Sequence, residues 1–512
     1  MEKKYKQIKY KFILLFIFLL TFSNFVLFVS LLQGFSLDIS TFINIALKQQ
    51  GGLKILDDFF VPEGFLIPIL YYYLAIFIEN KTVAHFFISI LLNSFYFLLI
   101  FLIISNKFKD NLTALYFAFI SSCFFLSLMG GIYFEHFIIV FFLTGILLVD
   151  ISNKSILNLL LLSLILNFLF FAKISIGIPA ILLIFIYFIF VNKKNFKSYY
   201  YLFIFSLIIF LFFLYFIFSN NWSEYYKQVF EVGMIYSKYY KNSNLITIFT
   251  NPFDLDLKLL LFNFKEILSG NLNLNYGAIL SSLYSFLMIL LLVILIFKKN
   301  KNYFLIFLIL SHFALFSISG QGFANKYFLT GIISGALYSS NYNISLKYFK
   351  ILLLNLVFLL LLINNKFINV DSINTLSNFE LYDKKTFNDN IDRYQSNLDL
   401  IKYFNEINSI INNQSYFILN KQLFYINLHR NTHSVDPLSM YDHVNCNKYS
   451  QSCVNLVLKQ FEIKKPNYII YVERENKWFI DGYLFDLHST ISTRYNAEKF
   501  KFNTITMLKI NY

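Results

Sequence analysis

Four charged side chains border long apolar runs in this sequence, and their chemistry suits a reaction at a phosphate group. Asp38 follows the first run, and Glu135 lies at the start of a later one. Lys173 and Lys326 each lie in a short connection between two runs. A carboxylate can act as a general base, and lysine ammonium groups can neutralise a phosphate. Together these residues predict a base beside a phosphate-binding pocket.

Each of these charges also has a plain structural explanation. A lysine at a helix end is commonly an interfacial anchor, and a lone aspartate such as Asp38 is commonly a cap or a surface residue. A histidine at such a position, like His136 next to Glu135, is commonly an interfacial side chain. The chemical interpretation therefore depends on convergence, because the residues must lie on the same side of a membrane.

The apolar runs are long enough to form transmembrane helices. Hydrophobic residues make up 57% of the chain, and a bilayer core takes roughly 20 apolar helical residues to cross. The first run has no small-residue cleavage site after it and is predicted to be a retained helix. We predict a polytopic α-helical membrane protein with about eleven spans, near residues 10–32, 82–104, 111–129, 136–150, 155–172, 174–191, 199–218, 278–297, 303–319, 327–342 and 348–364.

Basic residues indicate how these helices are oriented. The N-terminus is rich in lysine, and every second loop after it is basic, whereas the alternate short loops carry almost no charge. Because positively charged loops stay in the cytoplasm, the N-terminus is predicted to be cytoplasmic, and an odd number of helices places the tail outside. The candidate residues then share the outer side. The same lysines account for the net charge of +14, so we do not expect a nucleic-acid partner.

Two domains are predicted, a membrane domain over residues 1–364 and a soluble extracytoplasmic α/β domain over residues 365–512. The membrane domain carries outer loops at 33–81 and 219–277. Within the first loop, the apolar stretch 65–78 is too short to span and predicts a re-entrant or interfacial helix. In the tail we predict helices at 398–411 and 454–461, and strands at 415–419, 466–472 and 504–510.

The chain has three cysteines. Cys123 lies in an apolar run and is expected to be an ordinary core residue. Cys446 and Cys453 lie in the tail, where an oxidising compartment would allow a disulfide; the alternative is two unrelated thiols. No zinc-binding spacing, nucleotide-binding loop or nucleophile elbow is found. We therefore expect no cofactor: a divalent metal could join such a reaction, but no ligand set supports one.

The order of these features resembles the GT-C superfamily of membrane glycosyltransferases, and within it the bacterial protein O-mannosyltransferases and lipid A aminoarabinose transferases. The family has a first helix, an outer loop with a catalytic aspartate, and a Tyr-rich stretch, which Phe60-Val-Pro-Glu-Gly-Phe-Leu-Ile-Pro-Ile-Leu-Tyr-Tyr-Tyr73 resembles. Glu135 matches an acidic residue at the start of the fourth helix, and Lys173 with Pro179 loosely matches a Lys-Pro motif. Lys326-Tyr327 matches a His-Tyr pattern with lysine in place of histidine.

The resemblance covers the layout of nearly the whole chain, with two departures. A single Asp38 followed by Ile39 replaces the usual acidic pair, and the double proline of the Tyr-rich stretch is absent. The resemblance implies a location in the bacterial inner membrane. It also implies a sugar donor carried on a polyprenyl phosphate and an extracytoplasmic acceptor, which would be a lipid, a glycan or a protein.

The resemblance further implies a role for each candidate residue. Asp38 is expected to act as the catalytic base of a single, inverting displacement, or to orient the acceptor hydroxyl. Glu135 is expected to support Asp38 or to contact the acceptor. Lys173 and Lys326 are expected to bind the donor phosphate. The vicinity of donor and acceptor would include His136, Tyr327 and Glu63.

Two other classes of protein remain open. A transporter or flippase of a lipid-linked saccharide would also be polytopic, although transporters usually place charges near the bilayer midplane and contain helix repeats. The third class is a non-catalytic envelope-glycan assembly protein.

Overall fold

The computed structural model gives a mostly helical chain. It describes residues 2–32, 40–50, 52–55, 64–78, 81–126, 131–151, 155–192, 196–226, 229, 288–297, 303–318, 329–339, 403–412, 414–418, 461–472, 494–495, 497–502 and 505–512.

Contacts divide the chain into two compact units, each assembled from segments that are distant in sequence. The first unit comprises Met1–Leu31, Ser89–Phe212 and Ser243–Ser377. The second comprises Leu32–Ile88, Phe213–Asn242 and Asn378–Tyr512. Helices α4 and α9 each begin in one unit and end in the other.

Four helices of the described part of the chain are long and apolar enough to cross a membrane: Tyr10–Leu31, Val83–Phe108, Phe134–Ile151 and Phe196–Ile217. Shorter apolar helices accompany them, at Leu66–Ala75, Asn111–Phe125, Ile156–Ala172, Ile176–Val191, Met288–Phe297 and Tyr303–Leu315. The chain is thus compatible with a membrane-embedded protein.

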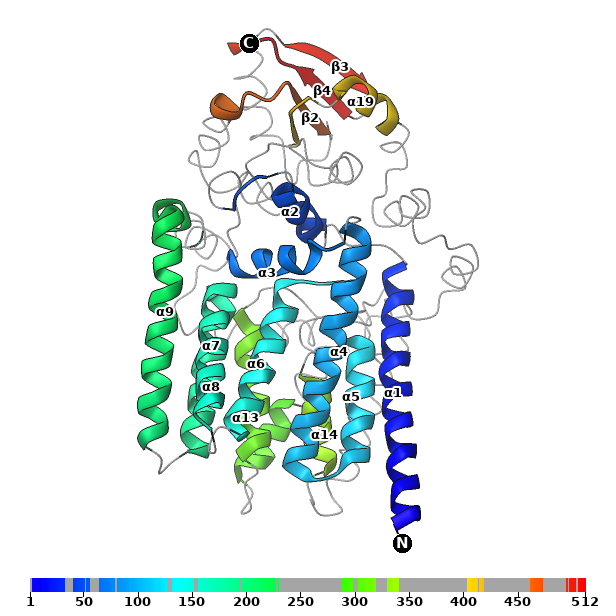
Figure 1. Cartoon of the computed structure of the whole chain (residues 1–512), viewed down its shortest axis with the longest axis vertical. Helices are drawn as coiled ribbons and strands as arrows, with labels where there is room; N and C mark the ends of the chain where they lie inside the picture. Colours follow the sequence, from blue (N-terminus) through cyan, green and yellow to red (C-terminus); the bar gives the residue numbers. More distant parts are fainter. Residues whose placement is uncertain are drawn as a thin grey trace, which may run out of the picture. The chain divides into compact units, whose positions relative to one another are not determined.

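The first unit is a bundle whose helices run side by side (Figure 1). Its elements are α1 (Glu2–Leu32), most of α4 (Lys81–Phe108), α5 (Asn111–Phe125), α6 (Phe134–Ile151), α7 (Ile156–Ala172), α8 (Ile174–Val191), the first part of α9 (Phe196–Tyr225), α13 (Tyr303–Ile318) and α14 (Thr330–Ser339). Side-chain caps mark two helix starts. Asp110 accepts a hydrogen bond from the Thr113 amide at the start of α5, and Ser155 accepts one from the Leu157 amide at the start of α7.

Glycines bring helices of this bundle close together. A Cβ at Gly145 of α6 would collide with the Ile184 side chain of α8. On α14, Gly331 and Gly335 form a Gly-x-x-x-Gly pattern, and a Cβ there would collide with Ser121 and Ile104 respectively. Small residues allow such close approach in membranes, where dispersion contacts largely replace the hydrophobic effect between helices.

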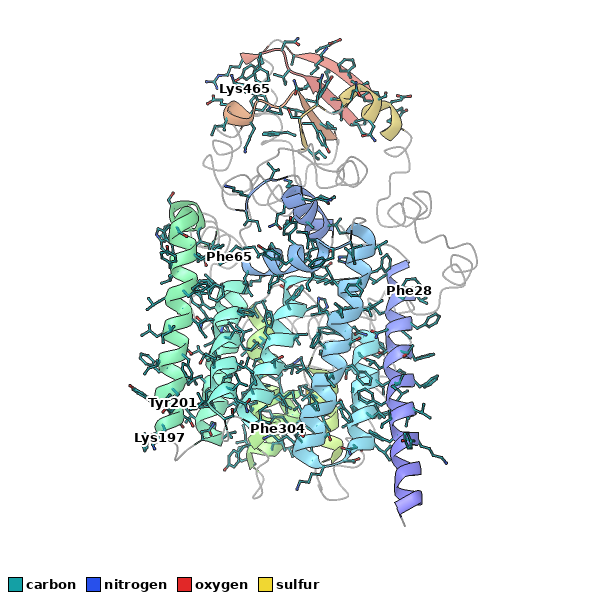
Figure 2. The ribbon with its side chains drawn as sticks, in the orientation of Figure 1. Phe28, Phe65, Lys197, Tyr201, Phe304 and Lys465 are labelled. Atoms are coloured by element: carbon teal, nitrogen blue, oxygen red, sulfur yellow. The ribbon has the colours of Figure 1, made fainter. Side chains whose placement is uncertain are left out.

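The two least buried spans are attached to the bundle by polar side chains as well as by aromatic contacts. Large apolar side chains project from α1 and α9 into the surroundings (Figure 2). Asn24 of α1 donates to Ser94 of α4 and accepts from Asn93 of the same helix. Asn167 of α7 donates to the Ser206 carbonyl of α9. Hydrogen bonds of this kind hold helices together where apolar contact is limited.

The second unit contains α2 (Ser40–Gln50), α3 (Leu66–Ala75) and the start of α4. Tyr71 of α3 and His85 of α4 are fully buried, and the Tyr71 hydroxyl lies 2.7 Å from His85 Nδ1. Burial raises the pKa of Tyr71, so its hydroxyl stays protonated and can donate to the imidazole. This bond joins α3 to α4.

The same unit contains a mixed four-stranded sheet in the order β1-β2-β4-β3. The strands are β1 (Tyr416–Ile418), β2 (Tyr468–Val472), β3 (Glu498–Phe502) and β4 (Ile505–Lys509), and helix α19 (Phe404–Ile411) packs beside them. β1 and β2 are parallel, whereas β4 is antiparallel to both of its neighbours. The core between α19 and the sheet is built from Ile407, Ile411, Tyr416, Ile418, Tyr468, Ile470, Ile505 and Met507.

Helices occupy most of the runs that the sequence predicts, although the number of spans and the tail domain as a whole stay predictions. α3 lies within the predicted stretch 65–78, but α2 and β3 were not predicted. α9 continues to Tyr225, beyond the predicted end at 218. The predicted helix at 348–364 lies outside the described residues.

Candidate functional site

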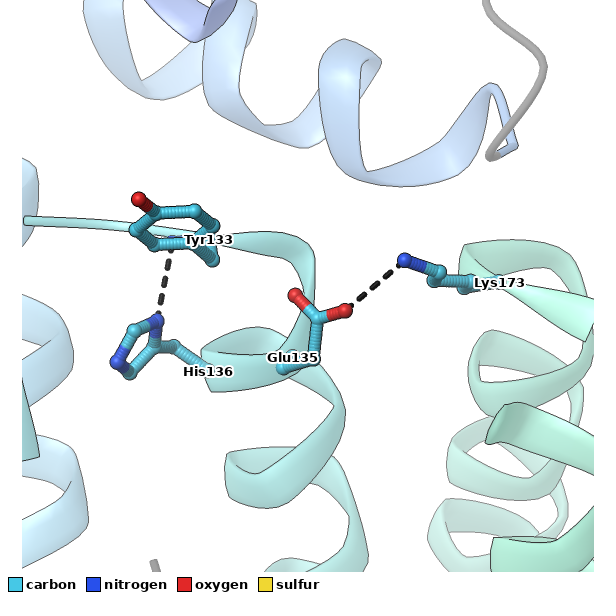
Figure 3. A network of polar contacts seen from close by, with 4 residues as sticks. All are labelled: Tyr133, Glu135, His136 and Lys173. Carbon is cyan, nitrogen blue, oxygen red and sulfur yellow. Dashed lines mark hydrogen bonds and ion pairs between the residues drawn. The ribbon is translucent and has the colours of Figure 1, made fainter. Parts of the chain in front are cut away.

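Glu135 and Lys173 form a buried ion pair in the first unit. The Lys173 Nζ lies 2.9 Å from Glu135 Oε1, and only 3% of the glutamate side chain and 13% of the lysine side chain are exposed. The two residues are 38 positions apart in sequence. Figure 3 shows their side chains pointing toward each other from neighbouring helices. The pair is therefore a tertiary contact between helix ends.

Helix geometry explains where each partner stands. Glu135 lies in the first turn of α6, where the helix dipole favours a negative charge. Lys173 is the single residue between α7 and α8, with an extended backbone at φ −161° and ψ 103°. Its carbonyl accepts from the Gly177 amide in the first turn of α8. A Cβ at Gly177 would overlap the Leu169 carbonyl, so glycine allows this tight reversal.

The ammonium group has a second neighbour. Lys173 Nζ lies 5.8 Å from the centroid of the Phe134 ring, a distance at which cation–π attraction operates. A buried carboxylate, an ammonium and an aromatic face thus meet at one end of α6. An ammonium in this position can neutralise an anionic ligand and can orient it through charge-assisted hydrogen bonds.

His136 has a different role in the described structure. Its Nδ1 accepts from the Tyr133 amide at 2.9 Å, and its Nε2 lies 2.7 Å from the Phe125 carbonyl (Figure 3 shows the first bond). The ring also meets Phe125 edge-on. His136 therefore joins the end of α5 to the start of α6. For a ring nitrogen of His136 to hydrogen-bond with the sugar donor or the acceptor, one of these two bonds would have to break.

The remaining predicted site residues lie outside the described residues: Asp38, Glu63, Lys326, Tyr327, Cys446 and Cys453. Of the predicted set, the structure brings together Glu135 and Lys173, with His136 beside them. Within the described ranges, no group of three His, Cys, Asp or Glu side chains is placed to hold a metal ion.

Comparison with known proteins adds no relative. No family model matches the chain, and no curated protein matches it.

A second ion pair, between the partly exposed Lys107 and the largely buried Asp150, was not predicted from the sequence. Lys107 was interpreted only as part of a basic loop. The available signal was the single acidic residue Asp150 at the end of a long apolar run, since a charge in that position is seldom left unpaired.

Proposed function

We propose that this chain is a polytopic membrane glycosyltransferase that takes its sugar from a polyprenyl-phosphate donor. In this proposal about eleven helices cross the bilayer, the N-terminus is cytoplasmic, and the tail and candidate site face outward. The observation that carries the proposal is the buried Glu135–Lys173 pair. It supplies a cation at the junction of three apolar helices, α6, α7 and α8, where a lipid-linked phosphate could approach from the bilayer.

The proposed reaction is a single displacement. The acceptor oxygen bonds to the anomeric carbon as the bond from that carbon to the phosphate oxygen breaks, and Asp38 accepts the acceptor's proton. Polyprenyl phosphate leaves with the bonding electrons. Lys173 stabilises the negative charge on the phosphate, while Glu135 holds the lysine in place. An ammonium has three N–H donors, so Lys173 can bridge a carboxylate and a phosphate.

The test measures turnover of polyprenyl-phosphate hexose and pentose, each labelled in the sugar, by membranes containing the protein. The double variant Glu135→Gln/Lys173→Met keeps the side-chain lengths but removes both charges, so neither partner is left as a lone buried ion. We expect it to fold and to bind donor more weakly, by roughly tenfold or more, the effect of losing one charged hydrogen bond. The control is Lys197→Met, since Lys197 lies exposed in the first turn of α9.

Parental donor affinity in the double variant would refute the phosphate-binding role of Lys173. Failure of the parent to consume any donor would refute the transferase proposal. Movement of intact donor across vesicle membranes would instead support the transporter.

A further inference from the structure

At the end of α6 far from Glu135, Asp150 receives two donors on the same oxygen. Its Oδ1 lies 2.6 Å from Lys107 Nζ of α4 and 2.7 Å from the Tyr187 hydroxyl of α8. The Asp150 side chain is 9% exposed. Three helices are therefore joined through one oxygen of a largely buried carboxylate.

Aromatic rings extend this cluster to a fourth helix. The ammonium of Lys107 lies 5.3 Å from the ring centroid of Tyr187 and 5.1 Å from that of Phe304, the second residue of α13. Tyr187 stacks on Phe307, with centroids 4.6 Å apart. Figure 2 shows Phe304 at the end of the bundle where Lys197 also lies. The Asp150 cluster, as we call Asp150, Lys107, Tyr187 and Phe304, thus fixes the ends of α4, α6, α8 and α13.

The pair α6 and α8 is consequently held at both ends. One end carries Glu135 and the residue that directly precedes α8, Lys173. The other carries Asp150 and Tyr187. Between them, Gly145 of α6 packs closely against Ile184 of α8. Packed helices behave as stiff elements in a close-packed interior, so releasing one end changes the angle at which the other end meets its partner.

We propose that Asp150, Lys107 and Tyr187 are positioning residues for the Glu135–Lys173 pair. The polar bonds of the Asp150 cluster set the tilt of α6 against α8, and this tilt sets the distance between the glutamate and the lysine at the opposite end. The positioning itself is a property of the helix pair; its importance for donor binding rests on the proposed function.

In this cluster, the charge of Asp150 can be removed while its hydrogen-bonding oxygen is kept. Both donors bond to Oδ1, and Oδ2 is buried with no hydrogen-bond partner within the part of the chain that the structure describes. Asp150→Asn therefore keeps an oxygen for Tyr187 and Lys107, places an amide group where no bond is lost, and removes the charge. Tyr187→Phe removes one donor and leaves the ion pair intact. The control is Thr144→Val, because among the described residues the Thr144 hydroxyl bonds to its own helix, at the Val140 carbonyl.

The readout is the rate at which a small amine-acylating reagent modifies Lys173, quantified by mass spectrometry of its peptide with exposed Lys197 as the internal reference. In the parent, Glu135 and burial protect Lys173. We expect Asp150→Asn to raise the rate about tenfold, the size of one hydrogen bond to a charged group, and Tyr187→Phe to raise it severalfold. Thr144→Val should leave it unchanged.

An unchanged Lys173 rate in Asp150→Asn or Tyr187→Phe would overturn the proposal, as would an equal rise in Thr144→Val. If Asp150→Asn does not fold, Tyr187→Phe decides alone, since it deletes a single hydroxyl. Acylation does not require donor turnover. An inactive parent with the expected labelling pattern would refute the proposed function and leave the positioning intact.

Discussion

At the scale of single residues, the Glu135–Lys173 pair combines a structural constraint with its proposed chemistry. Both side chains are largely removed from water. A buried ion pair adds little net stability over well-packed neutral residues, but removing one partner leaves an uncompensated charge. Single substitutions in the pair must therefore be interpreted together with their effect on folding.

The first prediction compares the removal of one partner of the pair with the removal of both. Lys173→Met alone should destabilise the protein by about 3–5 kcal/mol, because Glu135 stays buried without its cation. Adding Glu135→Gln should recover most of that loss, so the two effects will not add. Thermal unfolding in detergent, followed by the retention of monodisperse protein, measures both variants. Equal destabilisation in the single and double variants would show that packing, not charge, decides stability here.

The second prediction concerns Asp38, which lies outside the described residues. Asp38→Asn keeps the shape of the side chain but cannot accept the acceptor's proton. We expect the protein to insert and bind donor normally while transfer falls at least about a hundredfold, the lower range for loss of a general base. Sugar transfer in membranes with matched expression measures this. Asp57→Asn is the control, since Asp57 belongs to the predicted outer loop 33–81 and we expect its side chain to be solvated. Near-parental transfer in Asp38→Asn would refute the assignment of the base.

At the scale of secondary-structure elements, the bundle uses different contacts at its centre and at its edge. Glycines allow α5 and α14, and α6 and α8, to approach closely. The peripheral helices α1 and α9 are held by a few side-chain hydrogen bonds and by aromatic contacts, such as those of Phe16 with Phe97 and of Phe210 with Phe171. This division follows from burial, because a helix with few protein neighbours has little surface for dispersion contacts.

The third prediction tests the glycine contact on α14. Gly331→Leu places a branched side chain where even a Cβ would collide with Ser121 of α5. Overpacking of this kind typically costs about 1–3 kcal/mol, and we expect a lower unfolding temperature with reduced folded yield. Ser334→Ala on the same helix is the control, because the buried Ser334 hydroxyl has no hydrogen-bond partner among the described residues. Similar stability of Gly331→Leu and the parent would mean that α5 and α14 can separate freely.

At the scale of the whole molecule, sequence continuity and structural units do not coincide. The unit that holds the tail sheet also includes residues from 32–88 and 213–242. The predicted boundary at residue 364 divides the chain by composition, whereas the two units divide it by contact. Residues 32–88 and 213–242 share the second unit with the tail. In the proposed arrangement, the first of these segments follows the outer end of α1, and the second includes the outer end of α9.

The fourth prediction tests the orientation on which the proposed site depends. A reporter that is active only outside the cytoplasm should be active when fused after Tyr512 and silent when fused at Lys194. The reason is the alternation of basic and uncharged loops, which retains the basic loops in the cytoplasm. Activity of both fusions, compared at equal expression, measures this. The reverse pattern would exchange the two sides and place the Asp150 cluster, not Glu135, on the outside.

The sequence by itself determines where most of the helices lie. Apolar runs and helix-start residues are local signals, so the helices from α4 to α8 occur close to their predicted ranges. The tail strands β1, β2 and β4 were predicted by the same local reasoning. β3 was missed because three of the five residues in its sequence, Glu-Lys-Phe-Lys-Phe, are charged; its pairing with β4 supports it in the fold.

Only the tertiary structure decides which of these elements meet. Glu135 and Lys173 were each notable in the sequence, but their contact depends on the sharp reversal at Lys173 and on the packing of α6 beside α7 and α8. Lys107 and Asp150 were not linked at all, because helix neighbours are chosen by close packing over many residues. Charge at a helix end is thus readable from sequence, whereas its partner is fixed by the way the helices pack.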